Sequence, residues 1–425
     1  MSALALALVW IGAGVLAAAL LPRLRLRRAA GLAPLAAGLS ALAATRSEAW
    51  PGPLASVGYG GHLELGRIGL GLIVAGGVAL SVSLSLAPYL DGGEVLPACL
   101  VGAAVVVALS ATVPLIWGLA FAVAVGALAV RWIGAAPGRG SLAAGRVAGL
   151  GAAALIGAAT FLPSAGPGVA TRTALAGGLL AGGISTLLGL LPVGGWAAGA
   201  VASIRGGDLA AWGLLLAPAV LLSAGTAIPD LPAGAHTPTA NVLLCLGLAS
   251  ALFGSAMAAV APPQERYGRV LLADLALAAA GLGSTHSAGR LGGLLIVLTH
   301  LAAAPLLLHP PRPGLARPRQ LSWLALTGVP PTPSFWGRLL ILEALAATSG
   351  SALAAGICAA GGLLAGALAG LTSAASAASA VDDAGQPAVA TRLLAWLVPL
   401  CALGIGLAPA GIAGRIFGVD FAAGF

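Results

Sequence analysis

Residues 326–341, Leu-Thr-Gly-Val-Pro-Pro-Thr-Pro-Ser-Phe-Trp-Gly-Arg-Leu-Leu-Ile, place three prolines inside a long apolar stretch. Proline lacks a backbone N–H and disrupts a helix, so this pattern predicts a broken helix at Pro330 and Pro331. Residues 191–196, Leu-Pro-Val-Gly-Gly-Trp, predict a second break at Pro192 and Gly194. A bilayer tolerates the unpaired peptide groups of a break where they line a polar cavity. Both breaks are therefore candidate functional positions, with ordinary proline kinks as the alternative.

The composition of the whole chain indicates a membrane protein. Of its 425 residues, 59% are hydrophobic and 8% are charged, whereas a soluble globular protein carries about 25% charged residues. Apolar stretches of about 18 to 25 residues, each long enough to cross a bilayer as a helix, recur along the sequence. Four cysteines without CxxC spacing are interpreted as small buried hydrophobic residues: Cys99, Cys245, Cys358 and Cys401.

Charged and proline-rich segments divide the chain into about fourteen apolar spans. The two breaks lie five spans apart, in corresponding places of two halves, which is typical of transporters built from internal repeats. We therefore predict an all-α polytopic membrane protein with about 14 transmembrane helices and two inverted repeats, each with a broken helix. The spans cover about residues 3–21, 29–44, 67–87, 95–112, 114–131, 142–162, 174–191, 208–228, 239–261, 269–285, 290–308, 321–347, 352–379 and 391–417.

The basic residues predict the orientation of these spans. All twenty are arginine, against twelve acidic residues. If residues 22–28 are cytoplasmic, fourteen arginines fall in loops on that side and five on the other, with Arg338 left inside a span. Cytoplasmic loops of membrane proteins carry an excess of basic residues, so this count predicts that both termini lie outside. The net charge thus describes topology, and we expect no nucleic-acid partner.

The stretch from Leu326 to Ile341 resembles the signature of one family: the antiporter-like membrane subunits of complex I (NADH-quinone oxidoreductase), of membrane-bound hydrogenases and of Mrp sodium/proton antiporters. That signature is approximately L-x-G-I-P-P-x-x-G-F-x-G-K. Residues 269–281 are similar to the family's helix K-R-L-L-A-Y-S-S-I-A-H-L-G, and residues 298–304 to its N-H-A-x-x-K. Shorter similarities lie at 192–196 (P-x-H-x-W) and 115–119 (F-x-W-E-L). The resemblance covers about residues 95–380 and implies the fold of a divergent member.

The chain departs from that family where the family has its charged residues. The resemblance implies a glutamate, two lysines and a further lysine or glutamate in a line at mid-membrane that carries protons. Only the last position is ionisable here, as Arg338. Residues 95–230 then have no ionisable residue at mid-membrane, and we expect this first half to be dry or inactive. The uncharged positions are Gly118, Leu187 and Ala304, and two family histidines are replaced by Gly194 and Ala279.

Four ionisable residues lie within predicted spans and are candidates for a proton or ion path: Asp274, His300, Arg338 and Glu343. A charge at the centre of a bilayer costs about 2.5 to 3.5 kcal/mol, so each needs a partner or water. We expect Arg338 and Glu343 to form an ion pair, to act as the output end of a relay, or to extend to the interface. Asp274 is expected to carry protons or to pair with an arginine of a neighbouring chain. His300 is expected to titrate or to join two helices by a hydrogen bond.

Three functions are compatible with these observations. In the first, the chain is a largely structural membrane subunit of a complex-I-like respiratory or hydrogenase complex, and its own ion path is degenerate or lost. In the second, it is an active proton or sodium translocator that uses Asp274 and Glu343. In the third, it is a stand-alone secondary transporter that binds a solute at the breaks.

The resemblance also implies a location and partners. We expect a multi-pass protein of the bacterial or archaeal inner (cytoplasmic) membrane that assembles with other antiporter-like subunits, small membrane subunits and an iron–sulfur redox arm. The sequence has no cysteine cluster and no dinucleotide-binding fingerprint, so we predict a non-catalytic subunit without a cofactor or metal site of its own. The predicted segments are 1–94 (N-terminal helices), 95–235 (first antiporter-like half), 236–380 (second half) and 381–425 (C-terminal helix).

Overall fold

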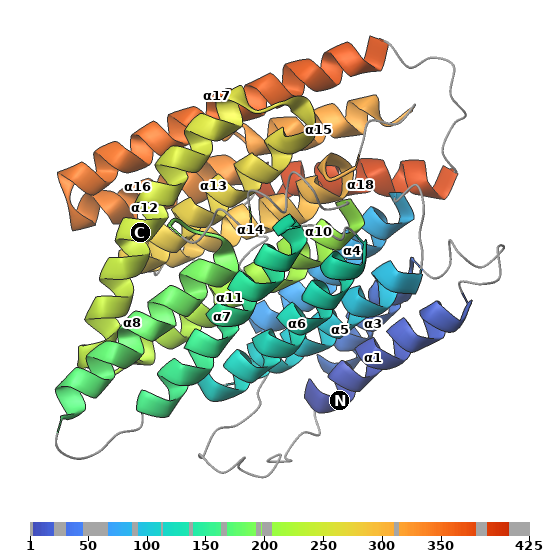
Figure 1. Cartoon of the computed structure of the whole chain (residues 1–425). Coiled ribbons are helices and arrows are strands. Elements are labelled where there is room, and N and C mark those ends of the chain that lie inside the picture. The colour runs from blue at the N-terminus through green and yellow to red at the C-terminus, as the bar shows by residue number, and fades with distance from the viewer. Residues whose placement is uncertain are drawn as a thin grey trace. The chain divides into compact units, whose positions relative to one another are not determined.

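The computed structural model of the chain describes residues 3–20, 31–45, 67–86, 92–111, 114–135, 139–162, 168–192, 197, 206–309, 314–379 and 389–407. The elements in these ranges are helices (Figure 1). Seven of the described helices are long and apolar enough to cross a membrane. The predicted all-α, multi-pass membrane fold is therefore confirmed, whereas the number of fourteen spans and the four segment boundaries stay predictions.

The chain divides into two compact units. Unit 1 comprises Met1–Gly189 and Val193–Leu243, and unit 2 comprises Leu190–Pro192 and Leu244–Phe425. The helices of unit 1 are α1 (Ala3–Leu20), α3 (Ala33–Thr45), α4 (Arg67–Leu86), α5 (Gly92–Ser110), α6 (Pro114–Ala135), α7 (Arg139–Phe161), α8 (Val169–Leu188), α10 (Gly206–Ala211), a π-helical turn (Trp212–Leu216), α11 (Ala217–Ala227), a 3-10 turn (Ile228–Asp230) and the start of α12 (Ala233–Val260).

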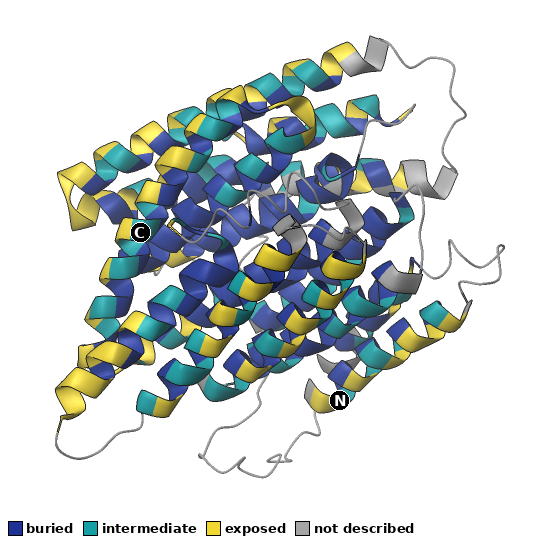
Figure 2. Ribbon diagram, viewed as in Figure 1, coloured by how far each residue is buried: buried dark blue, intermediate teal, exposed yellow. Residues whose placement is uncertain are grey.

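In the part of unit 2 that the structure describes, the rest of α12 is followed by six further helices. They are α13 (Pro263–Gly283), α14 (Ser287–Leu307), α15 (Ala316–Leu326), α16 (Pro333–Thr348), α17 (Gly350–Ser379) and α18 (Val389–Leu407). The central helix is α14, which packs against α13, α15, α16 and α18. Helix α14 has 21 residues, and 89% of its most apolar 18-residue stretch is buried. Its ribbon is accordingly mostly dark blue in Figure 2.

Two facing glycines set α14 and α16 in close contact. A Cβ atom at Gly292 would lie 2.5 Å from the carbonyl oxygen of Gly337, and a Cβ at Gly337 would lie 2.9 Å from the carbonyl oxygen of Gly292. Only residues without a side chain permit backbones this close. Because Arg338 follows Gly337, this contact brings the arginine of α16 against the buried interior of unit 2.

The predicted second break is present between α15 and α16. Helix α15 ends at Leu326, and Gly328 then adopts a left-handed conformation with φ of 70°. Thr332 accepts a hydrogen bond from the backbone N–H of Phe335, and Pro333 occupies the first turn of α16. A threonine cap followed by proline is a common helix start, because proline lacks the N–H that the first turn leaves unpaired. Pro330 and Pro331 lie exposed in the connecting turn.

At the first break, α8 ends at Leu188, and Gly189 follows in a left-handed conformation with φ of 75°. The indole N–H of Trp212 donates to the carbonyl oxygen of Leu187 at 3.1 Å, which satisfies one of the carbonyls that end α8. In unit 2, the backbone N–H of Leu191 donates to the Ser250 hydroxyl at 2.8 Å. Pro192 is in the turn that follows, and Gly194 lies outside the described residues.

Two arginines, Arg266 and Arg319, bind the ends of helices in unit 2. Arg266 donates to the carbonyl oxygens of Ala261 and Ala369 and to the hydroxyl of Ser373, which ties the start of α13 to α17. Arg319 donates to the carbonyl oxygens of Leu306 and His309 at the end of α14. Burial lowers the pKa of Arg319 to about 10, so this guanidinium stays charged at neutral pH.

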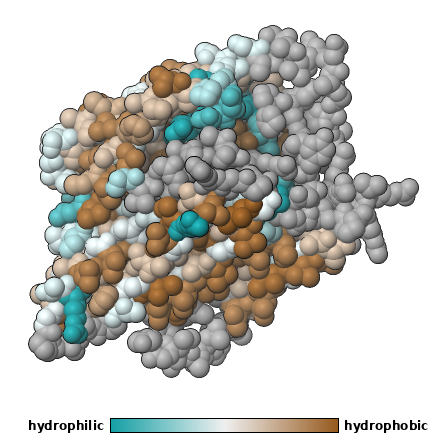
Figure 3. All heavy atoms as spheres, viewed as in Figure 1, coloured by the Kyte–Doolittle hydropathy of each residue, from teal (hydrophilic) through white to brown (hydrophobic). Residues whose placement is uncertain are grey.

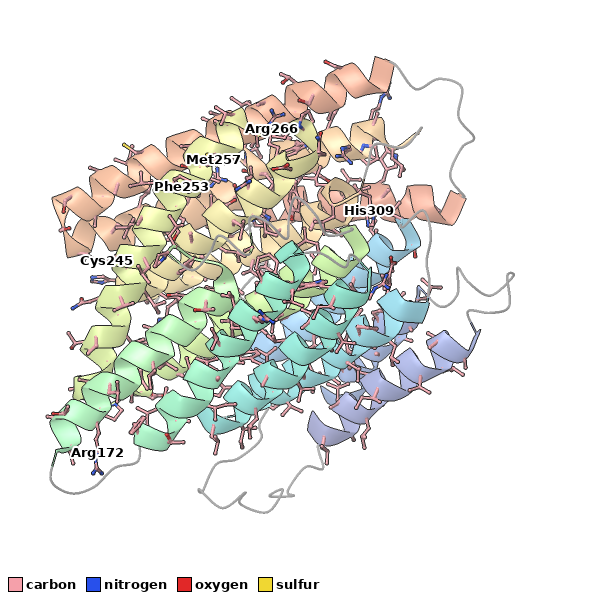
Figure 4. All side chains as sticks on the ribbon, in the orientation of Figure 1. Arg172, Cys245, Phe253, Met257, Arg266 and His309 are labelled. Atoms are coloured by element: carbon pink, nitrogen blue, oxygen red, sulfur yellow. The ribbon has the colours of Figure 1, made fainter. Side chains whose placement is uncertain are left out.

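Helices α12 and α17 expose large apolar side chains, among them Phe253 and Val260 on α12 and Ile357 on α17. Figure 3 shows broad hydrophobic areas on the visible face of the described residues. Figure 4 labels Cys245, Phe253 and Met257 on α12, where Phe253 is 54% exposed. The prediction that all four cysteines are buried is wrong for three of them, since Cys245, Cys358 and Cys401 are exposed and Cys99 is buried. The reason is that an apolar side chain on a membrane helix can face lipid as well as protein.

We predict that Gly292→Ala destabilises the fold, because its Cβ has to displace the backbone of α16. Overpacking of this kind costs about 1 to 3 kcal/mol. The control is Gly361→Ala on α17, where no atom lies within 4 Å of the added Cβ. Thermal unfolding in detergent should show a lower midpoint for Gly292→Ala alone, and equal midpoints for the two variants would contradict the close contact.

Candidate functional site

Asp274 and Arg338 form a buried ion pair in unit 2. The Arg338 Nε donates to Asp274 Oδ1 at 3.1 Å and Nη2 donates to Oδ2 at 3.0 Å. Two parallel bonds of this kind are the strongest arrangement that an arginine and a carboxylate adopt. Asp274 is 1% exposed and Arg338 is 4% exposed, so water screens neither charge. The pair joins α13 to α16.

Arg338 also binds the broken helix. Its Nη2 donates to the carbonyl oxygen of Leu326 at 3.0 Å and its Nη1 to that of Thr327 at 3.1 Å. These carbonyls end α15 and have no partner in their own helix. A Cβ at Gly328 would lie 2.5 Å from Nη1, so the guanidinium fills the space beside this glycine. The side chain of Arg338 therefore donates hydrogen bonds to the carbonyl groups at the break and also neutralises the charge of Asp274.

His300 extends the cluster from the other side of Asp274. Its Nε2 lies 3.0 Å from Asp274 Oδ2, and its Nδ1 lies 3.2 Å from the hydroxyl of Tyr267. Tyr267 packs edge-on against Trp323 of α15, with ring centroids 6.3 Å apart. His300 and Tyr267 are each 2% exposed. The four groups Tyr267, His300, Asp274 and Arg338 thus form one continuous hydrogen-bonded line.

The hydrogen-bond partners of His300 define its tautomer. Asp274, as the ion-pair partner of Arg338, is a carboxylate and only accepts hydrogen bonds, so His300 Nε2 carries the hydrogen. In the neutral imidazole, Nδ1 then accepts the hydrogen of the Tyr267 hydroxyl. With a neutral histidine, every polar atom between Tyr267 and Arg338 has a partner, and the cluster as a whole carries no net charge.

The pairing of Arg338 with Glu343 is wrong. Glu343 is exposed and takes no part in the buried line, and Arg338 pairs with Asp274 instead. Five residues turn an α-helix by about 140° beyond a full turn, so the two side chains leave α16 on different faces. Asp274 has its arginine partner within this chain, rather than in a neighbouring one. The structure therefore brings together three of the four candidate residues.

Tyr267 was not predicted from the sequence. A tyrosine at the start of an apolar helix has no special signal of its own. Its distance from Asp274 is a usable signal, because seven residues are close to two helical turns and place both side chains on one face of α13. Within the described ranges, no group of three or more histidine, cysteine, aspartate or glutamate residues is arranged to hold a metal ion.

Unit 1 has a different distribution of charge. Among the described residues of unit 1, Arg131 Nη2 lies 3.5 Å from Glu94 Oε1, in an ion pair in which Glu94 is buried and Arg131 is half-buried. Glu94 lies in the first turn of α5 and Arg131 near the end of α6, so this pair sits at helix ends. The positions that are charged in the resembled family are Gly118 and Leu187 here. Leu187 is buried and carries no charge to the first break.

We predict that Asp274→Asn destabilises the protein by about 3 to 5 kcal/mol, because it leaves the Arg338 charge buried without a counter-charge. The double variant Asp274→Asn/Arg338→Gln removes both charges and should recover much of that loss. Unfolding midpoints of the wild type, the single variants and the double variant complete a cycle that isolates the pair. Additive losses would show that the two side chains do not interact.

No protein-family model matches the sequence, and no curated protein matches it. Solved structures match it in fold. A chain of respiratory complex I from Thermus thermophilus is 18% identical, with a TM-score of 0.77 and an alignment that covers 98% of this chain and 97% of that chain. A chain of the Mrp complex from Dietzia sp. DQ12-45-1b is 16% identical, with a TM-score of 0.78 and coverage of 98% and 52%.

A third match is a chain of the membrane-bound sulfane sulfur reductase, an archaeal respiratory membrane complex. It is 17% identical, with a TM-score of 0.75, and the alignment covers 96% of this chain and 77% of that chain. The three matches cover nearly the whole of this chain, and at these identities they establish the fold. The fold that the sequence motifs implied is therefore confirmed: the chain is built like membrane chains of complex I and of the Mrp complex.

Proposed function

We propose that the chain is an antiporter-like membrane subunit of a respiratory or hydrogenase complex that couples electron transfer to proton or sodium translocation, and that its own ion path is degenerate. Its role in that complex is largely structural. The observation that carries this proposal is the closed cluster at the second break. Arg338 is neutralised by Asp274 and bound to two carbonyl oxygens, so the one charged position left from the family's line is fixed in place.

The packing of unit 1 supports the loss of an ion path in the first half. Gly118 stands where the family has a glutamate, and a Cβ there would lie 3.2 Å from the backbone nitrogen of Ile156 on α7. The space for a longer side chain is already taken. At the break, the neutral indole of Trp212 binds the Leu187 carbonyl. Neither position offers a group that binds and releases a proton.

The same fold supports the proposed surroundings. We place the chain in the cytoplasmic membrane of a bacterium or archaeon with both termini outside, beside other antiporter-like and small membrane subunits. An iron–sulfur arm held by partner subunits would carry out the redox chemistry, with no cofactor in this chain. Glu343, exposed beside Leu339 on α16, offers a carboxylate to a basic group of a neighbouring membrane subunit.

Active translocation is the second candidate, because Tyr267, His300 and Asp274 are joined by hydrogen bonds as a proton path requires. A path that continues through Glu343 is not favoured, since that residue lies on a different face of α16 from Arg338. A stand-alone transporter is the third candidate, and the composition of the purified assembly distinguishes it from the other two.

We expect the chain to co-purify at a fixed ratio with other membrane subunits and with iron–sulfur proteins after gentle extraction from native membranes. Mass spectrometry of the intact assembly measures this ratio. Redox partners at fixed stoichiometry would support a subunit of an electron-transfer complex. A chain that is isolated alone at the same detergent concentration would contradict the proposal and direct attention to solute binding.

The number of ions translocated per electron distinguishes a structural role of this chain from active translocation by it. In vesicles that contain the complex, the double variant Asp274→Asn/Arg338→Gln should translocate as many ions per electron as the wild type, because the proposal assigns no ion flux to this pair. Subunit occupancy is measured in the same preparation, so that loss of the chain is not mistaken for loss of coupling. A reduced ratio at full occupancy would favour the active translocator.

A further inference from the structure

Glu343 is a charged residue on the outside of a membrane helix. Among the described residues of unit 2, three arginine or acidic side chains are exposed: Arg290, Arg317 and Glu343. The two arginines lie in the first turns of α14 and α15, at the ends of their helices. Glu343 lies five residues before the end of α16, which corresponds to about 7.5 Å along the helix axis. Its carboxylate therefore needs a partner within the membrane.

This chain offers no such partner among the residues that the structure describes. Side chains of an α-helix tilt toward its N-terminus, so Glu343 leans toward the break and away from the nearer helix end at Thr348. Arg338, the other ionisable residue of α16, is already paired with Asp274. No described residue forms an ion pair with Glu343. Because an unpaired charge in a membrane is costly, a counter-charge has to come from elsewhere.

Glu343 lies in the middle of an exposed stripe of α16. Leu339 precedes it by four residues, and Ala346 and Ala347 follow it by three and four, a spacing that places all of them on one side of the helix. Leu339 is 43% exposed, and both alanines are exposed. Small side chains allow helices to approach closely in a membrane. We call these four residues the α16 face, which has the form of a helix contact with one charge at its centre.

The turn that precedes α16, residues 329–331, is exposed as well. Val329 is 43% exposed, and both prolines of the turn are exposed. Along the helix axes, the turn lies about 15 Å from the start of α15 and about 22 Å from the end of α16. It is therefore deep in a hydrocarbon layer about 30 Å thick. Irregular backbone at this depth occurs where protein or enclosed water covers it.

The exposed groups of both regions call for a partner that donates hydrogen bonds. Proline has no N–H, so Pro330 and Pro331 offer only carbonyl oxygens. The carbonyl oxygen of Val329 accepts from the N–H of Thr332 at 3.0 Å, whereas that of Pro330 accepts from no described residue. The carboxylate of Glu343 is also an acceptor. A complementary surface therefore carries donors, with a positive charge at the level of Glu343.

We propose that the α16 face and the turn at residues 329–331 bind a transmembrane helix of a neighbouring subunit, and that an arginine or lysine of that helix pairs with Glu343. This inference rests on the proposed function, which gives the chain neighbouring membrane subunits. It identifies which face of the chain makes one of these contacts and the chemistry that the partner brings to it.

A second copy of this chain fits the α16 face poorly. In a two-fold symmetric pair the same surface of both copies meets, so a contact centred on Glu343 brings two carboxylates together. A phospholipid also fits poorly, because at this depth it offers acyl chains, while its headgroup lies nearer the helix end at Thr348. A basic side chain on an adjacent helix reaches Glu343 from the side.

Photo-cross-linking in native membranes identifies the occupant. A benzophenone amino acid replaces Leu339 in one variant and Ala347 in another, so that Glu343 stays in place. The control position is Phe253 on α12, which is 54% exposed. Both variants should cross-link to one transmembrane segment that contains arginine or lysine, identified by mass spectrometry, and the control should not. Products with lipid alone, with a second copy, or with residues 408–425 of this chain would overturn the proposal.

The charge pair is tested by removing and exchanging the charges. Glu343→Gln should weaken association with the cross-linked subunit about 30-fold or more, as expected when one member of a buried ion pair is removed. Glu343→Arg should restore association when the partner's basic residue is replaced by glutamate. Arg317→Gln, which removes an exposed charge from α15, is the matched control and should have no effect. Native mass spectrometry after serial dilution measures the association. Equal association of wild type and Glu343→Gln, or no rescue by the exchange, would overturn the pair.

Failure of this inference is distinguishable from failure of the proposed function. Iron–sulfur partners at a fixed ratio, with only lipid products at the α16 face, would contradict this contact and leave the electron-transfer complex in place. A basic helix cross-linked to the α16 face in an assembly without redox proteins would support the contact and contradict the electron-transfer complex.

Discussion

The arginine fork at the second break is the interaction on which the rest of unit 2 depends. From α16, Arg338 joins the carboxylate of α13 to the two carbonyl groups that end α15. Each of these groups alone would be expensive in a membrane interior, because neither a charge nor an unpaired peptide group finds water there. Together they are satisfied. The close packing of Gly292 against Gly337 then follows as a requirement, since it holds α16 at the depth where the fork reaches both partners.

The two breaks solve the same problem with different chemistry. At the first, a neutral indole, Trp212, binds a carbonyl oxygen near the end of α8. At the second, a guanidinium binds two carbonyl oxygens and therefore needs a counter-charge, which Asp274 provides. The neutral indole needs no further partner. The charged guanidinium needs a carboxylate, and that carboxylate binds His300, which in turn contacts Tyr267. The candidate site lies in unit 2 for this reason, and unit 1 packs Gly118 tightly where the family has a charge.

The sequence predicted the features that depend on local chemistry. Pro330 and Pro331 break a helix wherever they occur, so the second break and the apolar helices around it were predictable. The partner of Arg338 was not, because it depends on which face of α16 meets which neighbouring helix. Nearness in sequence favoured Glu343, but five residues place the two side chains on different faces. Tyr267 shares a face of α13 with Asp274, yet its contact with His300 depends on how α13 packs against α14, which no sequence pattern records.

The chain contains no lysine, and this has a consequence at the break. In the resembled family the position of Arg338 is a lysine or a glutamate, either of which can bind and release a proton. Arginine cannot release its proton, so its charge is permanent and needs a permanent counter-charge. Asp274 stands where the family's pattern has a tyrosine, and the structure pairs it with Arg338. The two departures from the pattern are thus one change: a position that can bind and release a proton in that family is here one half of a permanent ion pair between Arg338 and Asp274.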